Sequence, residues 1–300
     1  MKRLIVTCLA VTFSAAVFGQ ADDSGKKVNM GIAYQLGLNF TKPGTKRIDK
    51  DGVGVQNAFG LNINFNFNEN IGFATGLEFD FESYKVSMNT LNGTNYYLYS
   101  DSKIIQEEDL GENYVDIGKY KVFELTGRKY KNIYATIPTM LTFRTNALGD
   151  FRYYGKFGAR TSFLIKSTRN DVGNIFGLVG GGTVTGADID DIILNPSSYT
   201  KSTSEMEGMK TPYGNDVSFI RCSLGLAGGA QWNFTGNTML FAELGFYYGL
   251  TPINIEGGGK NKTMFNRNPG SSTSIADGSS DYFGLKTTQT QFCLKIGILF

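Results

Sequence analysis

The chain alternates bulky apolar residues with small or polar residues at a period of two over eight separate segments. This period is typical of β-strands whose two faces meet different surroundings. The segments cover 28–41, 54–67, 72–86, 131–145, 151–166, 218–234, 238–252 and 289–300. The last segment shows the pattern plainly, with Phe292, Leu294, Ile296, Ile298 and Phe300 on one face. The pattern therefore predicts an all-β protein built from eight antiparallel strands.

The two faces of these strands differ in charge. The apolar face has no charged residue in any segment, whereas the opposite face combines Gly, Asn, Gln and Ser with ten charges. The ten are Glu78, Asp80, Glu82, Arg144, Arg152, Lys156, Arg160, Arg221, Glu243 and Lys295. A secreted, lipocalin-like barrel would turn the apolar face inward, but the lumen of an eight-stranded barrel is too narrow for so many Phe, Leu and Ile side chains. The apolar face is therefore expected to face lipid, as in an outer-membrane barrel.

The connections between the segments alternate in length. The segments 68–70, 146–150 and 235–237 are tight turns, whereas 42–53, 87–130, 167–217 and 253–288 are longer. Outer-membrane barrels combine short periplasmic turns with longer extracellular loops. We therefore expect an eight-stranded, antiparallel, up-and-down transmembrane β-barrel with three long extracellular loops and both termini on the periplasmic side.

The N-terminus has the pattern of a secretory signal peptide. Lys2 and Arg3 precede an almost wholly apolar stretch over 4–18, and the sequence turns polar at Gln20. This stretch is shorter than the roughly 20 apolar residues that a spanning helix needs. The pattern predicts a signal peptide over 1–19 and an outer-membrane barrel over 20–300. The expected location is the cell outer membrane.

Three stretches of the predicted strands carry a resemblance to a known family. They are 60–65 with 76–79, then 133–141, and finally 294–300. They resemble the PorT-like outer-membrane β-barrel family of Bacteroidetes, and the resemblance covers the strands of nearly the whole mature chain but leaves out the long loops. It implies a small barrel, and it implies a possible role beside secretion machinery. The C-terminal Phe300 resembles the signal that outer-membrane assembly machinery reads, so that machinery and outer-membrane lipid are the partners we expect.

The composition excludes several classes of function. The chain has no histidine, which excludes Ser-His-Asp catalysis and histidine-ligated zinc or haem. Known membrane-barrel hydrolases, proteases and acyl transferases depend on histidine, so we expect no enzyme, no cofactor and no metal. Once Lys2 and Arg3 leave with the signal peptide, the 29 basic residues fall to 27 and equal the 27 acidic ones. A basic field for nucleic acid is therefore absent.

The charges of the inner face have two interpretations. They can pair and plug the lumen, or they can line a path for ions. Unpaired charges away from water are very costly, which favours pairing. We expect Glu243 to face Lys295 on adjacent strands, and Glu78 and Asp80 to reach Arg160 across the lumen. The predicted function is a non-enzymatic, structural or partner-binding barrel that uses its outer loops or periplasmic rim to bind an envelope protein. The alternative is a narrow pore for ions or small solutes.

Overall fold

The computed structural model describes residues 27–88, 94–111, 115–210, 217–235, 238–254, 263–267, 281–283 and 285–300. The predicted signal peptide over 1–19 lies outside these residues. Within the described ranges, no helix is both long enough and apolar enough to cross a bilayer.

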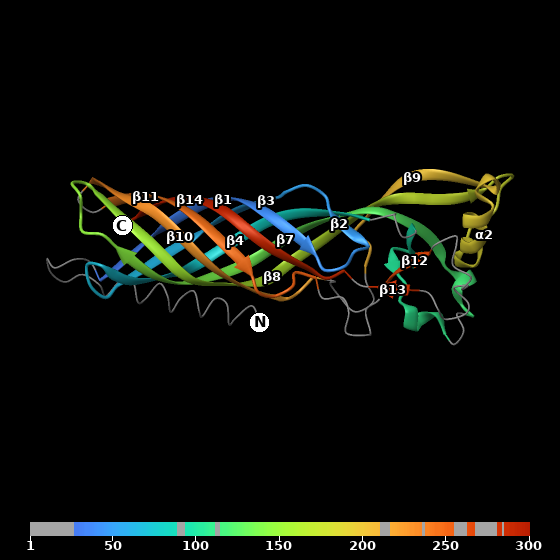
Figure 1. Cartoon of the computed structure of the whole chain (residues 1–300), viewed down its shortest axis with the longest axis horizontal. Helices are drawn as coiled ribbons and strands as arrows, with labels where there is room; N and C mark the ends of the chain where they lie inside the picture. Colours follow the sequence, from blue (N-terminus) through green and yellow to red (C-terminus); the bar gives the residue numbers. More distant parts are fainter. Residues whose placement is uncertain are drawn as a thin grey trace.

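Eight long antiparallel strands form a closed barrel (Figure 1). They are β1 (Val28–Pro43), β3 (Gly54–Asn66), β4 (Ile71–Met88), β7 (Lys121–Arg144), β8 (Phe151–Leu178), β10 (Ile220–Thr235), β11 (Thr238–Gly249) and β14 (Thr287–Leu299). Each strand pairs with its neighbours in this order around the ring. The eight predicted segments and the up-and-down topology are thereby confirmed.

The first and last strands close the barrel. β1 pairs with β14 along thirteen residue pairs, from Gly31 opposite Leu299 to Pro43 opposite Thr287. The seam extends to the chain end, because the Phe300 N–H donates to the Met30 carbonyl at 2.7 Å and the Met30 N–H donates back at 3.3 Å. Closure leaves no free strand edge inside the membrane, where an unpaired backbone group has no water to bond.

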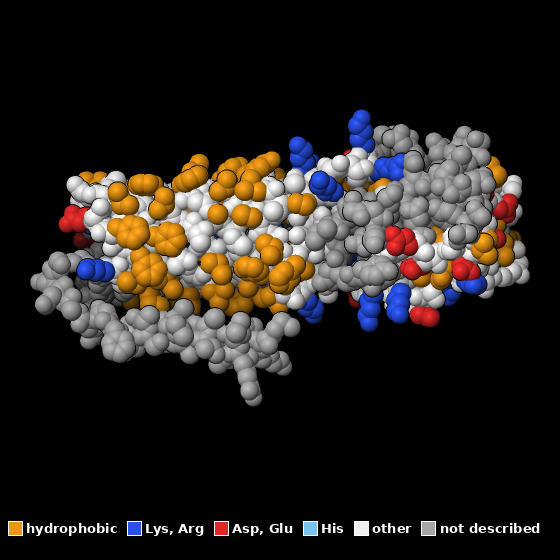
Figure 2. Space-filling view, turned by 90° about the horizontal axis from the view of Figure 1, so that it is seen from below, with side chains coloured by type: hydrophobic (Ala, Val, Ile, Leu, Met, Phe, Trp, Pro, Cys, Tyr) orange, Lys and Arg blue, Asp and Glu red, His pale blue; other side chains and the backbone are white. Residues whose placement is uncertain are grey.

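The apolar face lies outside, as the alternation predicted. Ile32, Leu36, Phe157, Leu226 and Ile296 are all 47% exposed or more. On the face seen in Figure 2, apolar side chains form a belt over the barrel, and most lysine and arginine side chains lie beyond the end of this belt. Aromatic residues stand at the periplasmic end of the belt: Trp232 stacks on Phe151 at 6.1 Å and contacts Phe234 at 5.3 Å.

The inward face changes from polar to apolar where β4 extends beyond the apolar belt. Below this level the inward side chains are polar, such as Asp80 and Glu82. Above it, Tyr84 and Val86 point inward and are buried, whereas Lys85 is exposed. The inversion follows from the surroundings: outward residues face lipid below this level and water above it.

This inversion corrects two predicted strand boundaries. β7 begins at Lys121 and not at 131, and β8 ends at Leu178 and not at 166. A search for strands with apolar residues on the outward face misses these extensions, because their apolar residues lie on the inner face. A bulge between Ile133 and Tyr134, opposite Lys166 and Leu164, also shifts the register there.

The long connections therefore contain regular secondary structure. Together with the outer ends of β7 and β8, they form an extension beyond the barrel (Figure 1). Its additional strands are β2 (Ile48–Lys50), β5 (Thr94–Ser100), β6 (Lys103–Ile104), β9 (Tyr199–Glu207), β12 (Met264–Arg267) and β13 (Asp281–Phe283). Its helices are α2 (Ile189–Leu194) and the 3-10 helices η1 (Glu107–Leu110), η3 (Ile117–Lys119), η4 (Gly186–Asp188) and η5 (Pro196–Ser198). β9 pairs with the end of β8, and β5 pairs with the start of β7.

Two hydrophobic cores stabilise the extension. One lies around Leu98, Leu110, Ile189, Ile192 and Phe265 and joins α2 to the sheet. The other lies at the outer mouth of the barrel. There, four residues of the connections pack with Tyr134 and Leu164 of the barrel wall. These four residues are Met209, Val217, Ile253 and Leu285. This second core, here called the apolar cap, covers the lumen from the outside.

Candidate functional site

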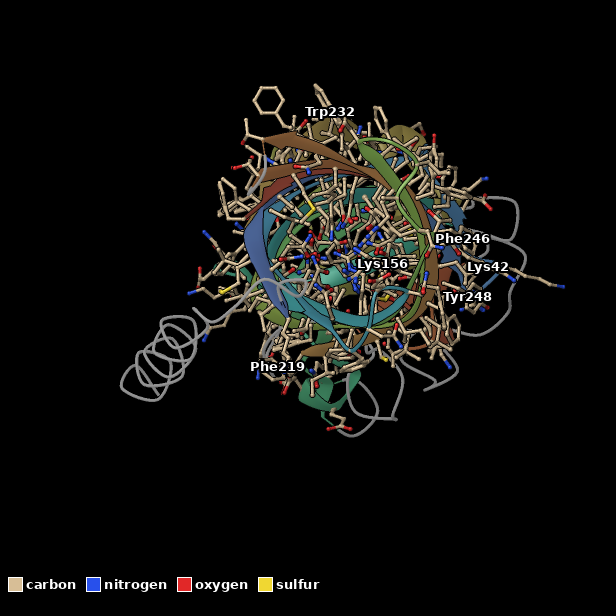
Figure 3. The ribbon with its side chains drawn as sticks, turned by 90° about the vertical axis from the view of Figure 1, so that its left-hand side faces the viewer. Lys42, Lys156, Phe219, Trp232, Phe246 and Tyr248 are labelled. Carbon is tan, nitrogen blue, oxygen red and sulfur yellow. The ribbon has the colours of Figure 1, made fainter. Side chains whose placement is uncertain are left out.

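The ten charges predicted to face inward lie on six strands, β4, β7, β8, β10, β11 and β14. β4 contributes the three acids Glu78, Asp80 and Glu82 at successive inward positions, because alternate residues of a strand share a face. Figure 3, seen from the periplasmic end, places Lys156 inside the ring of strands and Trp232, Phe246 and Tyr248 outside it. We call the ten charged residues the lumen charge network.

Arg160 of β8 stands at the centre of the network. Its Nη2 donates to Glu78 at 2.7 Å and to Asp80 at 3.2 Å. Asp80 also accepts a hydrogen bond from Gln56 at 3.0 Å and another from Thr136. Both acids and the guanidinium are at most 3% exposed. These bonds tie β8 to β4 across the intervening β7.

Two lysines make further ion pairs with acids of other strands. Lys156 of β8 donates to Glu243 of β11 at 2.6 Å. Lys295 of β14 donates to Glu78 of β4. Glu243 and Lys295 are cross-strand neighbours, as the sequence suggested, but each forms its ion pair with a different residue. These partners could not be predicted from the sequence, because they depend on how the side chains cross the lumen.

The outermost pair of the network lies under the apolar cap. Arg221 of β10 donates to Glu82 at 2.8 Å and to Gln289 at 2.8 Å. Its guanidinium lies 4.4 Å from the centre of the Tyr134 ring, which belongs to the cap. The network and the cap are therefore continuous, and together they fill the lumen from its middle to its outer mouth.

Inward aromatic residues are the main feature that the sequence analysis missed. Tyr247 lies under Arg160, 4.8 Å from ring centre to guanidinium carbon, and Tyr154 donates to Glu243 at 3.1 Å. Phe241 is also buried in the wall. Strand parity could have placed them inward, since Tyr154 and Tyr247 alternate with the lipid-facing Tyr153 and Tyr248.

Arg144 and Arg152 differ from the other eight members of the network. Both lie at the periplasmic end of the lumen, at the turn between β7 and β8. Across the described residues, neither guanidinium forms an ion pair. The remaining four bases and four acids balance each other.

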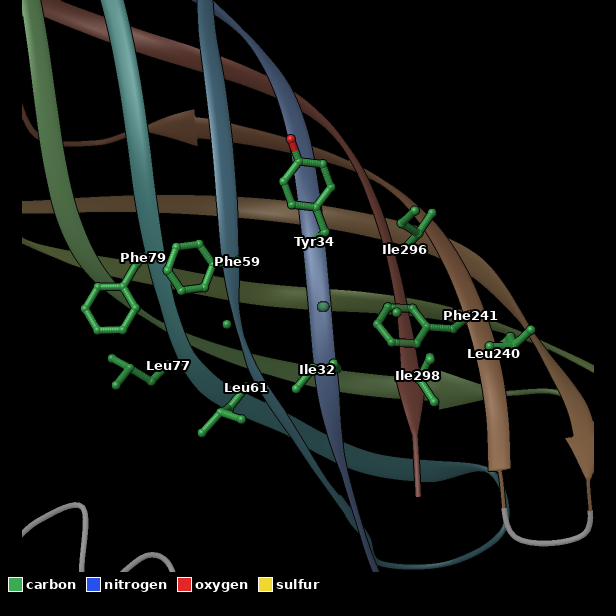
Figure 4. Close-up of a pocket in the computed structure, with 13 residues that line it drawn as sticks. Ile32, Tyr34, Phe59, Leu61, Leu77, Phe79, Leu240, Phe241, Ile296 and Ile298 are labelled. Carbon is green, nitrogen blue, oxygen red and sulfur yellow. The ribbon is translucent and has the colours of Figure 1, made fainter.

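A groove of about 910 Å³ lies on the outer wall of the barrel (Figure 4). Its floor is formed by the small residues Ala33, Gly60 and Gly297, which are neighbours in the sheet. Its sides are apolar side chains of the belt, including Ile32 and Ile296. The groove opens toward lipid, so its largely apolar lining suits acyl chains. In the part of the chain that the structure describes, no cluster of Cys, Asp and Glu has the spacing of a metal site.

A closed eight-stranded ring with an apolar outer belt and a polar lumen defines a small outer-membrane β-barrel. The sequence agrees: the chain belongs to the family described as outer membrane protein beta-barrel domain, whose model matches residues 18–254. The protein is therefore located in the cell outer membrane. No curated protein matches its sequence.

Solved structures of outer-membrane barrels are similar over most of their length. Neisserial surface protein A is 9% identical over 89% of this chain and 96% of its own, with a TM-score of 0.30. The attachment invasion locus protein Ail of Yersinia pestis is 12% identical over 91% and 99%, with a TM-score of 0.27. The outer membrane protease OmpT of Escherichia coli is 11% identical over 94% and 98%, with a TM-score of 0.35. At these values none of the three carries an argument about function.

Proposed function

We propose that this protein is a non-enzymatic outer-membrane barrel whose lumen is closed and whose extracellular extension binds a protein partner. The observation that carries the proposal is the extension itself. It adds six short strands and its own hydrophobic core to a barrel that needs neither to span the membrane. An ordered, protruding structure of this kind provides a rigid binding surface.

Apolar side chains at the far end of the extension support this proposal. Leu194 at the end of α2 is 68% exposed, and Val179 at the end of β8 is 63% exposed. Both lie next to the core that joins α2 to the sheet, where Leu178 and Ile193 pack. Exposed apolar residues on a rigid support, away from the lipid belt, are typical of protein interaction sites.

The resemblance to PorT-like barrels supports a finer version of the proposal. The resembling stretches lie on β3, β4, β7 and β14, which are strands of the barrel wall. A PorT-like barrel would act beside secretion machinery, and the partner would then be an envelope protein of that machinery. The absence of histidine and the pairing of all four lumen acids support a role without catalysis.

Site-specific cross-linking in intact cells tests where a partner binds. A photoreactive amino acid is placed at Leu194, at Val179 or, as the matched control, at the exposed Leu148 of the periplasmic turn. We expect one discrete adduct from positions 194 and 179 and none from 148. An adduct from 148 alone would move the binding surface to the periplasmic rim, and no adduct at any position would contradict the proposal.

Conductance in planar bilayers tests the closed lumen against the narrow pore. The lumen charge network and the apolar cap fill the lumen, so we expect no stable single-channel steps from the wild type. Removing the network in part, with Glu78→Gln and Arg160→Gln together, should raise the rate of transient openings. Large, stable steps from the wild-type barrel would instead establish the pore.

A further inference from the structure

The charges inside the lumen do not balance. Six bases and four acids face inward, and the four acids bind Lys156, Arg160, Arg221 and Lys295. Subtracting these four bases from the six leaves Arg144 and Arg152, so an excess of two positive charges lies at the periplasmic mouth. Uncompensated charges that are removed from water are strongly unfavourable.

The two arginines are close in the sheet. Arg144 is the last residue of β7 and lies opposite Tyr154 of β8, two positions from Arg152 on the same face. Arg144 is 8% exposed, and its Nε has no hydrogen-bond partner among the described residues. Arg152 is half-buried and connects this position to the mouth of the lumen. Two like charges thus lie close together on the inner face, at the periplasmic end of the lumen.

Three further residues lie around the two arginines. Gly72 of β4 lies beside the Arg144 guanidinium, and a Cβ atom there would come within 3.0 Å of Nη2. Thr142 faces inward next to Arg144 and has a buried hydroxyl without a partner in the described structure. Gln231 of β10 lies opposite Arg152 and is also buried. The periplasmic end of the lumen therefore combines two guanidinium groups with two uncharged donors, Thr142 of β7 and Gln231 of β10.

We propose that this cluster of side chains, formed by Arg144, Arg152, Thr142 and Gln231, binds a phosphate-type anion at the periplasmic mouth of the barrel. A guanidinium presents two parallel N–H donors that match two oxygens of a phosphate. A phosphate dianion would cancel the excess charge, and Thr142 and Gln231 would satisfy its remaining oxygens. The anion would be a free phosphate of the periplasm or the phosphate of a lipid headgroup at the inner leaflet.

Calorimetric titration of the folded barrel in a phosphate-free, non-ionic detergent tests the proposal. The probe is inorganic phosphate, with sodium chloride at the same ionic strength as the reference. We expect saturable binding at one site, and a loss of affinity of at least tenfold in the Arg144→Gln, Arg152→Gln double variant. The matched control is Lys131→Gln, which removes an exposed positive charge at the opposite end of the barrel and should bind phosphate as the wild type does.

A second arm distinguishes the two sources of the phosphate. The barrel is placed in nanodiscs of phosphatidylcholine with or without phosphatidylglycerol. A lipid headgroup is the source if phosphatidylglycerol lowers the apparent affinity for inorganic phosphate in the wild type but not in Arg152→Gln. Free phosphate is the source if the lipid has no effect.

Several results would overturn the proposal. They are unchanged phosphate binding in the double variant, a heat signal that chloride reproduces, or the absence of saturable binding by the wild type. If the double variant does not fold, the single variant Arg152→Gln decides the question, because this residue is half-buried and its loss removes one guanidinium. Arg152→Lys separates charge from geometry and should bind phosphate with an affinity between those of the wild type and Arg152→Gln.

Discussion

Glu243 and Lys295 face each other on β11 and β14, yet Glu243 binds Lys156 of β8 and Lys295 binds Glu78 of β4. Each of these two ion pairs therefore joins strands that are not neighbours in the sheet. β8 and β11 are separated by β10, and β14 and β4 are separated by β1 and β3. The lumen charge network thus holds the barrel together across its interior, in addition to the hydrogen bonds around its wall.

Loss of Glu78 should destabilise the barrel strongly. Glu78→Gln removes the acid that binds both Arg160 and Lys295, and breaking a buried pair from one side typically costs about 3–5 kcal/mol. Urea unfolding of the barrel in micelles measures the change. The control is Glu69→Gln in the exposed turn between β3 and β4, which should have no measurable effect. Equal stability of the two variants would show that the network does not support the fold.

Substitutions at adjacent positions of β14 should have different effects, because one position faces lipid and the other faces the lumen. Ile296 is 50% exposed on the lipid face, so Ile296→Arg should cost roughly 2–4 kcal/mol, as a charge near the bilayer midplane does. Lys295→Met should leave insertion into vesicles largely intact and affect only the lumen charge network. Folding is followed by the heat-modifiable migration of the barrel on gels. If Lys295→Met impaired insertion and Ile296→Arg did not, the inner and outer faces would be reversed.

Deletion of Phe300 should slow assembly more than it lowers stability. The residue adds two backbone hydrogen bonds to the seam between β14 and β1, and its ring is 56% exposed at the membrane boundary. The assembly signal that Phe300 resembles would be lost as well. Phe300→Tyr retains the backbone and an aromatic ring and is the control. Equal yields of folded barrel from the deletion and the control in cells would exclude a role as an assembly signal.

The tip of the extension should respond to pH through Tyr199. The Tyr199 hydroxyl donates to Asp191 at 2.6 Å, and this hydrogen bond raises the pKa of Tyr199 to about 12 and lowers the pKa of Asp191. A raised folded-state pKa of Tyr199 stabilises the tip below the ordinary tyrosine value of about 10, and this stabilisation is lost as the pH rises to about 12. The lowered pKa of Asp191 has the opposite sign, since its contribution is lost as the pH falls through the folded-state value.

Titration by NMR of tyrosine labelled at Cζ measures this pKa directly. We expect one tyrosine resonance that titrates near 12 and disappears in Tyr199→Phe. Asp191→Asn should return the resonance toward the ordinary value, whereas Asp190→Asn is the control. A Tyr199 resonance that titrates at the ordinary value in the wild type would contradict the hydrogen bond to Asp191.

The sequence by itself determined the barrel wall. Successive side chains of a strand face opposite surroundings. The contrast between lipid and a polar lumen therefore appears as alternating apolar and polar residues, such as Ile296 and Lys295. The same contrast predicted the ten charges of the inner face, and the alternating lengths of the connections predicted the periplasmic turns. It failed beyond the belt, where water replaces lipid outside and residues such as Tyr84 and Val86 turn inward. A local sequence pattern cannot distinguish a strand with inward apolar residues from a loop, because it does not show where the membrane ends.

Only the tertiary structure decided which charges meet. Strand parity places a side chain on the inner face, but long side chains such as Lys295 and Arg160 cross the lumen to strands that are distant in the sequence. Their partners depend on barrel closure, on the stagger between strands and on the space that residues such as Gly72 leave open. For the same reason, the excess charge at Arg144 and Arg152 becomes visible only when every other charge has a partner in three dimensions.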